Sequence, residues 1–480
     1  MHRLTASRQL LTIILLLYCS IAWAQDDVQK QFEQFREDKS EEFDDFRSQA
    51  DVEYEAFLRQ AWEAYEAFTP LKRPVRERQH AVAVSSADCR KTIPFMMEGL
   101  PEQNDGDWQG CPFPSEPPKD SKSSIFTFYG KAIEVTVKVA KRLALAGIRE
   151  SHVANAWKSI CRHKHDDLIN DCLAAKEANH MNDWTYVMLT QKIGLDLYGA
   201  DNPDKVAFFQ MFILVKSGYK VRLSRVGQRL KLLVPCSSPI YDTPYIVLDG
   251  TRYYIFDPEP NSPSFIYSYN REFAEASKFV DISIKEEPEY IPAEVQTRTL
   301  HTANGTFTLN ASINKNLIDF YSDYTAGDLD LYFHTPMSPE LRESIYPTLK
   351  EAISGQSQEE AANTLLSFVQ TAFPYMTDSE QFGFEKPNFP DETFYYPYCD
   401  CEDRAMLYGL LVNDLLGLET VLLDYPGHTA TGVLFPESVH GDRVELDDGR
   451  SYLVCDPTYM GASIGMCMEQ YQYVGPVVIF

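Results

Sequence analysis

An internal repeat at a constant offset of 199 residues constrains the fold of this chain more than any other feature. Each copy has a helix of about fifteen residues ending near a glycine, then a strand, then a glycine turn into a strand that ends in Asp-Pro. Seven positions are identical without a gap: Asp204/Asp403, Gly218/Gly417, Leu223/Leu422, Gly250/Gly449, Tyr253/Tyr452, Asp257/Asp456 and Pro258/Pro457. The repeat predicts a tandem duplication of one supersecondary unit. Chance matches between two unrelated α+β units are the alternative.

The second copy places a cysteine at the start of an apolar segment that is typical of a buried helix. Asp400 is a good N-cap, and Asp403 favours the first turn of the helix that follows. The N–H groups and dipole at a helix N-terminus stabilise a thiolate and a tetrahedral oxyanion. Cys401 is therefore the candidate nucleophile. Cys399 is the alternative, and it gains less from the dipole because it precedes the helix.

A base and an orienting acceptor follow on two strand-like segments. The run 420–424 turns and delivers His428, and the run 452–455 delivers Asp456. A thiol that transfers acyl groups needs both partners. If the two strands are antiparallel neighbours, the histidine and the aspartate lie side by side and face Cys401.

Each of these three residues also has a structural interpretation. Cys401 could be a structural thiol, His428 a loop histidine, and Asp456 the end of a strand. Their occurrence together, in this order and at this spacing, favours the catalytic interpretation.

The motifs resemble those of the transglutaminase-like superfamily, a branch of the papain-like cysteine enzymes. They are Cys-x-Asp-x-Ala at 401–405, Gly-His at 427–428 and Asp-Pro-Thr at 456–458. The matching part covers roughly 360–465, about a quarter of the chain.

The resemblance implies a role for each residue. Cys401 would be the nucleophile, His428 the general base and then acid, and Asp456 the residue that orients the imidazole. The chain has Thr-Ala-Thr directly after the histidine, where the family more usually has Ala-Trp-x. The group that completes the oxyanion hole is therefore not assigned, and Tyr396 and Tyr398 are nearby candidates.

The first copy lacks this chemistry. Asn202 stands at the nucleophile position and Arg229 approximately at the base position, while Asp257 is kept. Asparagine cannot form a thioester, and arginine is always protonated. We expect a catalytically dead copy that shapes or covers the active cleft.

The first 24 residues are typical of a secretory signal peptide. Arg3 and Arg8 precede the apolar run 10–17, and 22–24 is an Ala-Trp-Ala cleavage site. The run is too short to span a bilayer, and lipidation at Cys19 is disfavoured by the tyrosine before it. The sequence predicts an exported protein, periplasmic or extracellular, with no membrane span.

The net charge disfavours certain partners, and the cysteine count indicates a free thiol. The leader carries two positive charges, so the mature chain has a net charge of −26 − 2 = −28, which disfavours nucleic acid and anionic membranes as partners. Nine cysteines remain after cleavage, and an odd number leaves at least one thiol unpaired in an oxidising compartment. Disulfides such as Cys89–Cys111 or Cys161–Cys172 stay open, because spacing does not determine connectivity.

Residues 25–69 carry aromatic side chains with an eleven-residue step, which places them on one face of a long amphipathic helix. The two rows are Phe32, Phe43, Tyr54 and Tyr65, and Phe35, Phe46, Phe57 and Phe68. We expect this stripe to pack on its own protein or on a second copy. A dedicated partner-binding stalk is the alternative.

The rest of the chain divides by composition and periodicity. Helices are expected around 150–194 and 338–373, and strands at 245–247, 253–256 and 306–310. The expected segments are a linker at 70–124, a degenerate transglutaminase-like domain at 125–290, a β-rich connection at 291–345 and the catalytic domain at 346–480. The run Cys161-x-His163-x-His165 is more typical of a solvated helix end than of a metal site, because no second ligand pair follows.

The sequence thus predicts an α+β protein with two transglutaminase/papain-like lobes after a long amphipathic helix. We expect a protein or peptide substrate, with Cys401, His428 and Asp456 hydrolysing peptide or side-chain amide bonds and no cofactor or metal. Transfer to an amine acceptor would use the same residues. A non-catalytic binding or assembly protein on the same scaffold is the alternative from another class.

Overall fold

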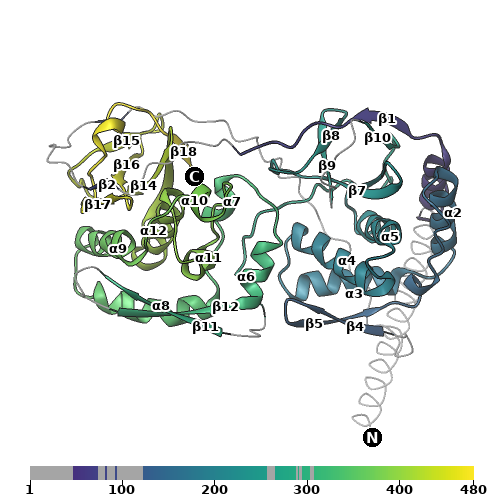
Figure 1. Ribbon diagram of the computed structural model, residues 1–480, viewed down its shortest axis with the longest axis horizontal. Coiled ribbons are helices and arrows are strands. Elements are labelled where there is room, and N and C mark those ends of the chain that lie inside the picture. Colours follow the sequence, from purple (N-terminus) through teal and green to yellow (C-terminus); the bar gives the residue numbers. More distant parts are fainter. Residues whose placement is uncertain are drawn as a thin grey trace, which may run out of the picture.

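A computed structural model describes 47–73, 82–83, 92–93, 123–256, 265–287, 290, 295–302 and 308–480. Helices and two large sheets are both present, so the expectation of an α+β fold is confirmed. The two six-stranded sheets lie in separate halves of the molecule (Figure 1). The predicted leader lies outside the described residues. No helix in the described part of the chain combines the length and apolarity needed to cross a bilayer.

The first sheet is antiparallel throughout, in the order β1-β10-β6-β7-β9-β8. Its strands are β1 Glu63–Glu66, β6 Arg222–Val226, β7 Arg229–Pro235, β8 Tyr245–Leu248, β9 Thr251–Ile255 and β10 Phe265–Ser268. Helix α5 packs against β6 and β7, and α4 packs against α5. The helices of this half are α2 Glu150–Cys161, α3 Asp166–Ala178, α4 Asp183–Tyr198 and α5 Pro203–Lys216. Because α5 is apolar on all sides, it is buried along nearly its whole length.

The second sheet has the order β18-β13-β14-β16-β15-β3, with one parallel pair, β15 and β3. Its strands are β3 Thr92–Ile93, β13 Glu419–Tyr425, β14 His428–Leu434, β15 Arg443–Glu445, β16 Ser451–Cys455 and β18 Val477–Ile479. Helix α12 (Cys401–Leu416) packs against β13 and β14, and α9 (Gln358–Ala372) packs against α12.

The two sheets share one strand order, and their three central strands also share the register of the repeat. Strands β10-β6-β7-β9-β8 of the first correspond to β18-β13-β14-β16-β15 of the second. The partner pair Arg222↔Leu233 becomes Val421↔Gly432, and both residues move by the repeat offset. The sequence repeat therefore corresponds to a repeated strand topology. Asp257, one of the seven repeat positions, lies outside the described residues.

The remaining elements connect and extend the two halves. The hairpins and short bridging strands are β4 Ser123–Phe128 with β5 Lys131–Thr136, β11 Val295–His301 with β12 Thr308–Asn314, and β2 Val82–Ala83 with β17 Tyr459–Met460. The remaining helices are η1 Ala140–Arg142, α6 Lys315–Ser322, α7 Leu329–Phe333, α8 Pro339–Ala352, α10 Asp378–Gln381, α11 Pro390–Tyr395 and η2 Glu469–Tyr471. The expected linker at 70–124 therefore contributes two short strands, β2 and β3, that pair beside the second half.

The prediction of one helix through residue 69 is wrong at its C-terminal end. The described helix runs over 47–59, and Glu63–Glu66 form strand β1, in which Tyr65 pairs with Ile266. The edge of β10 offers backbone N–H and C=O groups, and pairing with β1 satisfies them. This non-local pairing outweighs the helical period of the aromatic residues. The part of the stripe before residue 47 lies outside the described residues.

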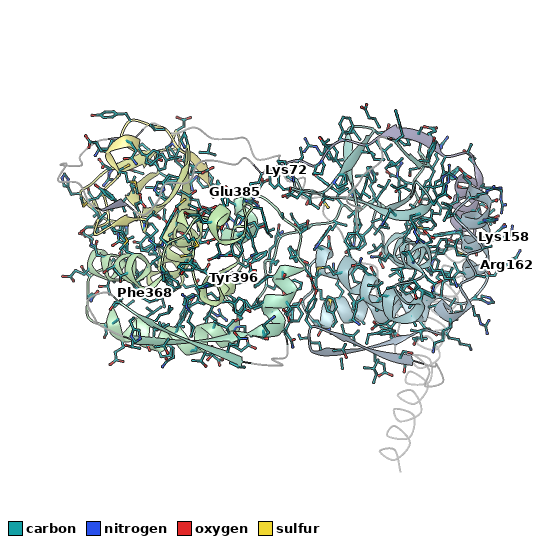
Figure 2. All side chains as sticks on the ribbon, viewed as in Figure 1. Lys72, Lys158, Arg162, Phe368, Glu385 and Tyr396 are labelled. Atoms are coloured by element: carbon teal, nitrogen blue, oxygen red, sulfur yellow. The ribbon has the colours of Figure 1, made fainter. Side chains whose placement is uncertain are left out.

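The described helix packs on its own protein. The Tyr54 ring is buried 4.7 Å from Trp157 and 5.4 Å from Phe273, and its hydroxyl lies 2.8 Å from that of Tyr269. Lys158 of α2 lies at the outer edge of this half (Figure 2), and its Nζ forms a salt bridge with Oε2 of Glu55 at 3.1 Å. Intramolecular packing thus explains the aromatic residues of 47–59.

The structure answers one open question about this half and contradicts one expectation. Cys161 and Cys172 are both free thiols: Cys161 ends α2 beside Lys216, whereas Cys172 is in the buried face of α3. His165 is buried rather than solvated, because its ring packs 5.3 Å from that of Phe212.

Replacing Tyr54 tests this packing. Tyr54→Ala should lower the free energy of unfolding by about 3–5 kcal/mol, as expected for an emptied aromatic site. Tyr54→Phe loses only the hydroxyl contact and should cost about 0.5–1.5 kcal/mol. The control Val52→Ala, on the same helix but 62% exposed, should change stability by less than about 0.5 kcal/mol. Equal urea midpoints for Tyr54→Ala and Val52→Ala would contradict this assignment.

Candidate active site

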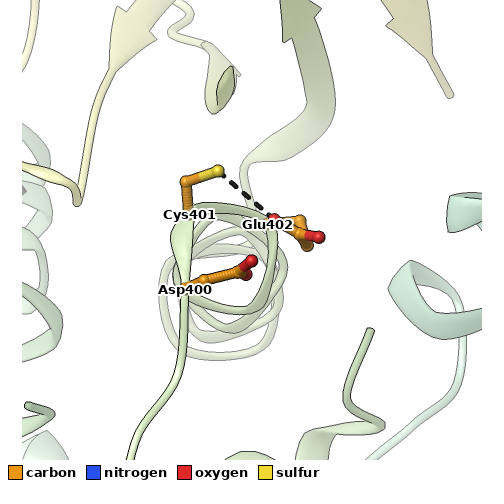
Figure 3. A group of neighbouring side chains, drawn as sticks. All are labelled: Asp400, Cys401 and Glu402. Carbon is orange, nitrogen blue, oxygen red and sulfur yellow. Dashed lines mark hydrogen bonds between the residues drawn. The ribbon is translucent and has the colours of Figure 1, made fainter. Parts of the chain in front are cut away.

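Helix α12 begins at Cys401, so the thiol lies at a helix N-terminus, as the sequence predicts. The side chain is fully buried, and Sγ donates a hydrogen bond to Oε2 of Glu402 at 3.2 Å (Figure 3). The first turn is joined to β14 because Thr431 Oγ1 donates to the carbonyl of Ala405 at 2.7 Å. The sulfur thus has a fixed place relative to the strand that carries the candidate base.

Asp400 occupies the N-cap position but does not cap the helix. Both of its carboxylate oxygens are buried and make no hydrogen bond with any described residue. Asp403 instead accepts from the Asp400 N–H at 3.3 Å, and from the backbone and side-chain N–H groups of Asn388 at 2.8 Å each. The helix start is therefore fixed by Asp403 and the loop before α11.

His428 and Asp456 are adjacent, as the sequence predicts. His428 heads β14, Asp456 follows β16, and these antiparallel neighbours place the two side chains at the same end of the sheet. Nε2 of His428 lies 2.7 Å from Oδ2 of Asp456, and both side chains are buried. The other oxygen of Asp456 accepts from the N–H groups of Thr458 at 2.9 Å and Tyr459 at 3.2 Å. The carboxylate is thereby held in position to orient the imidazole.

The imidazole lies beside two tyrosine rings, Tyr425 and Tyr471, which are 4.9 Å apart and in contact with each other. The ring of His428 lies 5.2 Å from that of Tyr471 and 6.4 Å from that of Tyr425, both nearly parallel to it. Its Nδ1 is buried and has no hydrogen-bond partner among the described residues. The structure thus joins the histidine to the aspartate, and it shows no hydrogen bond between Cys401 and His428.

Arg404 is a residue of this site that the sequence interpretation missed. Its buried guanidinium donates to the carbonyl of Pro457 at 3.4 Å and to that of Phe373. It also lies 5.1 Å from the centre of the Tyr375 ring. Arg404 therefore ties the first turn of α12 to the loop that carries Asp456. The sequence signal that could have revealed Arg404 is a single arginine at the start of an otherwise apolar helical segment.

Tyr375 was also missed, and it lies within electrostatic reach of the sulfur. Its pKa is raised by burial and then by the negative charge of the Cys401 thiolate. The earlier candidate Tyr396 faces elsewhere, with Lys386 Nζ 4.8 Å from its ring centre. Tyr398 is partly buried. Burial raises the pKa of the rival thiol Cys399 to about 12, so Cys399 is protonated at neutral pH.

A cluster of acidic side chains surrounds the start of α12. We call Asp378, Glu385, Asp400, Glu402 and Asp403 the acidic cluster. All but Glu385 are buried. Burial, followed by the charge of Asp403, raises the pKa of Asp378 to about 9. Burial, followed by the charge of Glu402, raises that of Asp403 to about 7.

The corresponding positions of the first copy carry no such site. Asn202 is exposed at the start of α5, where its Nδ2 donates to the carbonyl of Tyr198 at 2.8 Å. Arg229 heads β7, as His428 heads β14, and its guanidinium lies 3.5 Å from Asp204. A cavity of about 460 Å³ also lies in this half, beside β4 and α4, and none of its lining residues belongs to the site described above.

Comparisons with protein-family models, with curated proteins and with solved structures found no match for this chain.

The bridging role of Arg404 can be tested by Arg404→Lys. Lysine cannot reach both carbonyls, so buried acceptors are left unsatisfied. Urea unfolding should show a loss of about 1–3 kcal/mol. Arg450→Lys is the control, because Arg450 pairs with Glu419 and Asp448 at the surface and should tolerate the change. If both variants unfold at the same denaturant concentration as the unchanged protein, Arg404 does not hold the two segments together.

Proposed function

We propose that this protein is an exported, transglutaminase-like cysteine enzyme that hydrolyses peptide or side-chain amide bonds. The observation that carries the proposal is the 2.7 Å contact between His428 Nε2 and Asp456 Oδ2, with Nδ1 of the same ring left without a partner among the described residues. A buried imidazole oriented by a carboxylate on one nitrogen is suited to exchange protons on the other. Cys401, at the start of the helix packed on the same strand, is the group proposed to use it.

The proposed reaction proceeds through a thioester. Nδ1 of His428 takes the thiol proton, and Sγ of Cys401 attacks the amide carbonyl carbon to give a tetrahedral intermediate. The C–N bond then breaks, and the amine leaves with the proton from Nδ1. Water, deprotonated by the same nitrogen, attacks the thioester carbonyl, which releases the carboxylic acid and returns the proton to sulfur. Asp456 keeps the ring oriented and stabilises the imidazolium throughout.

The N-terminus of α12 and the hydroxyl of Tyr375 are proposed to stabilise the thiolate and the oxyanion of the tetrahedral intermediate. The first N–H groups of α12 carry partial positive charge, which stabilises the thiolate and the oxyanion. Tyr375 is a further candidate for the oxyanion partner, because burial and the charge of Cys401 raise its pKa and keep its hydroxyl protonated as a hydrogen-bond donor. In the resting site the thiol donates to Glu402, so the proposed activation exchanges this bond for one to His428.

Hydrolysis is preferred to transfer, because water needs no dedicated acceptor site. A true cross-linking reaction would use the same three residues and differ only in the second nucleophile. Because Cys401 and His428 are both fully buried, the substrate enters only when the site opens.

The first half is proposed to be a degenerate copy produced by tandem duplication. Its support is the shared strand order at the repeat offset. With Asn202 and Arg229 in place of the thiol and the imidazole, its proposed role is to shape or cover the cleft.

The alternative is a non-catalytic binding or assembly protein. The observations that favour it are the complete burial of Cys401 and its hydrogen bond to Glu402 rather than to His428. Iodoacetamide labelling, with the modified cysteine identified by peptide mapping, separates the two functions. Rapid modification of Cys401 near neutral pH supports the enzyme, and uniformly slow modification of all cysteines supports the scaffold.

The catalytic assignment predicts a graded set of activities in an unbiased peptide-cleavage screen of the mature protein. Cys401→Ala should abolish cleavage while thermal unfolding stays nearly unchanged. Asp456→Asn should lower kcat by about 10²–10⁴-fold, because the imidazole loses its orienting carboxylate. Asn202→Ala is the matched control in the first copy, and its activity should equal that of the unchanged protein. Cleavage that survives Cys401→Ala would exclude this mechanism.

A further inference from the structure

Helix α9 buries a glutamine side chain against the loop that carries Asp456. Gln370 lies near the C-terminal end of α9, and it is only 3% exposed. A buried amide that makes no hydrogen bonds costs free energy, and an apolar residue would fill the same space without that cost. The hydrogen-bond partners of this amide therefore show what its burial serves.

The hydrogen-bond partners of the Gln370 amide in the described structure all belong to one short loop. Its Nε2 lies 3.3 Å from the carbonyl oxygen of Asp456, 2.9 Å from that of Tyr459 and 3.1 Å from that of Ala462. Its Oε1 accepts from the N–H of Gly461 at 3.3 Å. The chain can turn around the amide because Gly461 has a φ of +81°, a conformation that favours glycine. Both ends of one side chain thus bind the backbone of this loop.

The loop determines the position of one carboxylate. The backbone carbonyl of Asp456 is held by Gln370, while its Oδ2 lies 2.7 Å from Nε2 of His428. The carboxylate also accepts from the N–H groups of residues 458 and 459, so its direction follows the path of the loop. Because the Gln370 amide fixes that path, it also fixes where Oδ2 meets the imidazole.

The helix that carries Gln370 is also joined to the helix that carries the candidate nucleophile. Helix α9 packs along α12 (Figure 1), and the hydroxyl of Tyr408 in α12 donates to the carbonyl of Ala362 in α9 at 3.3 Å. Helix α9 therefore contacts both parts of the candidate site. One is α12, which begins at Cys401, and the other is the loop that begins at Asp456.

We propose that Gln370 is a positioning residue that sets the place of the Asp456 carboxylate and, through it, the tautomer of His428. A carboxylate beside Nε2 favours the tautomer with its proton on that nitrogen, which leaves the lone pair of Nδ1 available for the thiol proton. The effect on turnover rests on the proposed function, whereas the effect on the tautomer does not.

Gln370→Met tests this role, because methionine is also long and unbranched but cannot donate to the three carbonyls. We expect kcat for peptide cleavage to fall about tenfold to a hundredfold with KM unchanged, as for a small displacement of a catalytic group. In ¹⁵N NMR spectra of the mature protein, the His428 ring should change from the Nε2-protonated tautomer to a mixture of tautomers. The signals of His428 are identified by their absence from the spectrum of His428→Ala.

Asn363→Ala is the matched control on the same helix. Oδ1 of Asn363 accepts from the N–H of Ile464 at 2.9 Å, so this residue anchors a later part of the same segment, and none of its described hydrogen bonds reaches Asp456. Asn363→Ala should keep both kcat and the His428 tautomer. Thermal unfolding of each variant establishes that it is folded at the assay temperature. Where Gln370→Met does not fold, Gln370→Asn, which withdraws the amide by one methylene, takes its place with the same expectation.

An unchanged His428 tautomer in the folded Gln370 variant would overturn the proposal, whatever happens to kcat. Equal losses of activity in the Gln370 variant and in Asn363→Ala would also overturn it, because they would indicate general anchoring of the loop. A mature protein that cleaves no peptide would refute the proposed function, and the tautomer comparison would still decide the role of Gln370. Peptide cleavage together with an unchanged tautomer in the variant would refute that role and leave the proposed function standing.

Discussion

The site depends on how the first turn of α12 is fixed between the sheet and the loop after β16. Thr431 bonds this turn to β14, and Arg404 bonds it to the segment that follows Asp456. Without these links, a thiol from a helix and an imidazole–carboxylate pair from two strands would have no defined relation. The buried arginine loses favourable hydration, so its carbonyl partners and the Tyr375 ring must compensate. The geometry of the candidate site and the stability of the fold therefore depend on the same few contacts.

The helix N-terminus and the neighbouring acidic side chain have opposite effects on the protonation of the Cys401 thiol. The helix N-terminus favours a thiolate at Cys401, whereas Glu402 accepts the hydrogen bond of the thiol and so favours the protonated form. A resting thiol is the consequence. Chemistry that needs a thiolate then requires a compensating positive charge, which the imidazolium of His428 would provide.

The sequence predicted the elements whose signals are local, and it failed where distant segments decide. The helix at Cys401, the strand that begins at His428 and the strand before Asp456 follow from apolar runs, glycine turns and the repeat. The strand Glu63–Glu66 did not follow, because its partner β10 is about two hundred residues away. Asp378 was missed for the same reason: nothing near it in the sequence reveals that it meets the start of α12. The bond between Cys401 and Glu402 depends on side-chain orientation, which spacing alone does not give.

Comparison of the two copies separates what the fold needs from what the site needs. The start of α5 is partly exposed, and Asp204 makes ordinary contacts there, accepting from Leu230 N–H at 2.7 Å. The same helix, turn and strand therefore form without a buried thiol or a cluster of carboxylates. The start of α12 instead buries Asp400, Cys401 and Glu402 together, at a cost in desolvation that the fold does not require. Buried ionisable side chains concentrated in only one of two equivalent places are expected where a protein carries out chemistry.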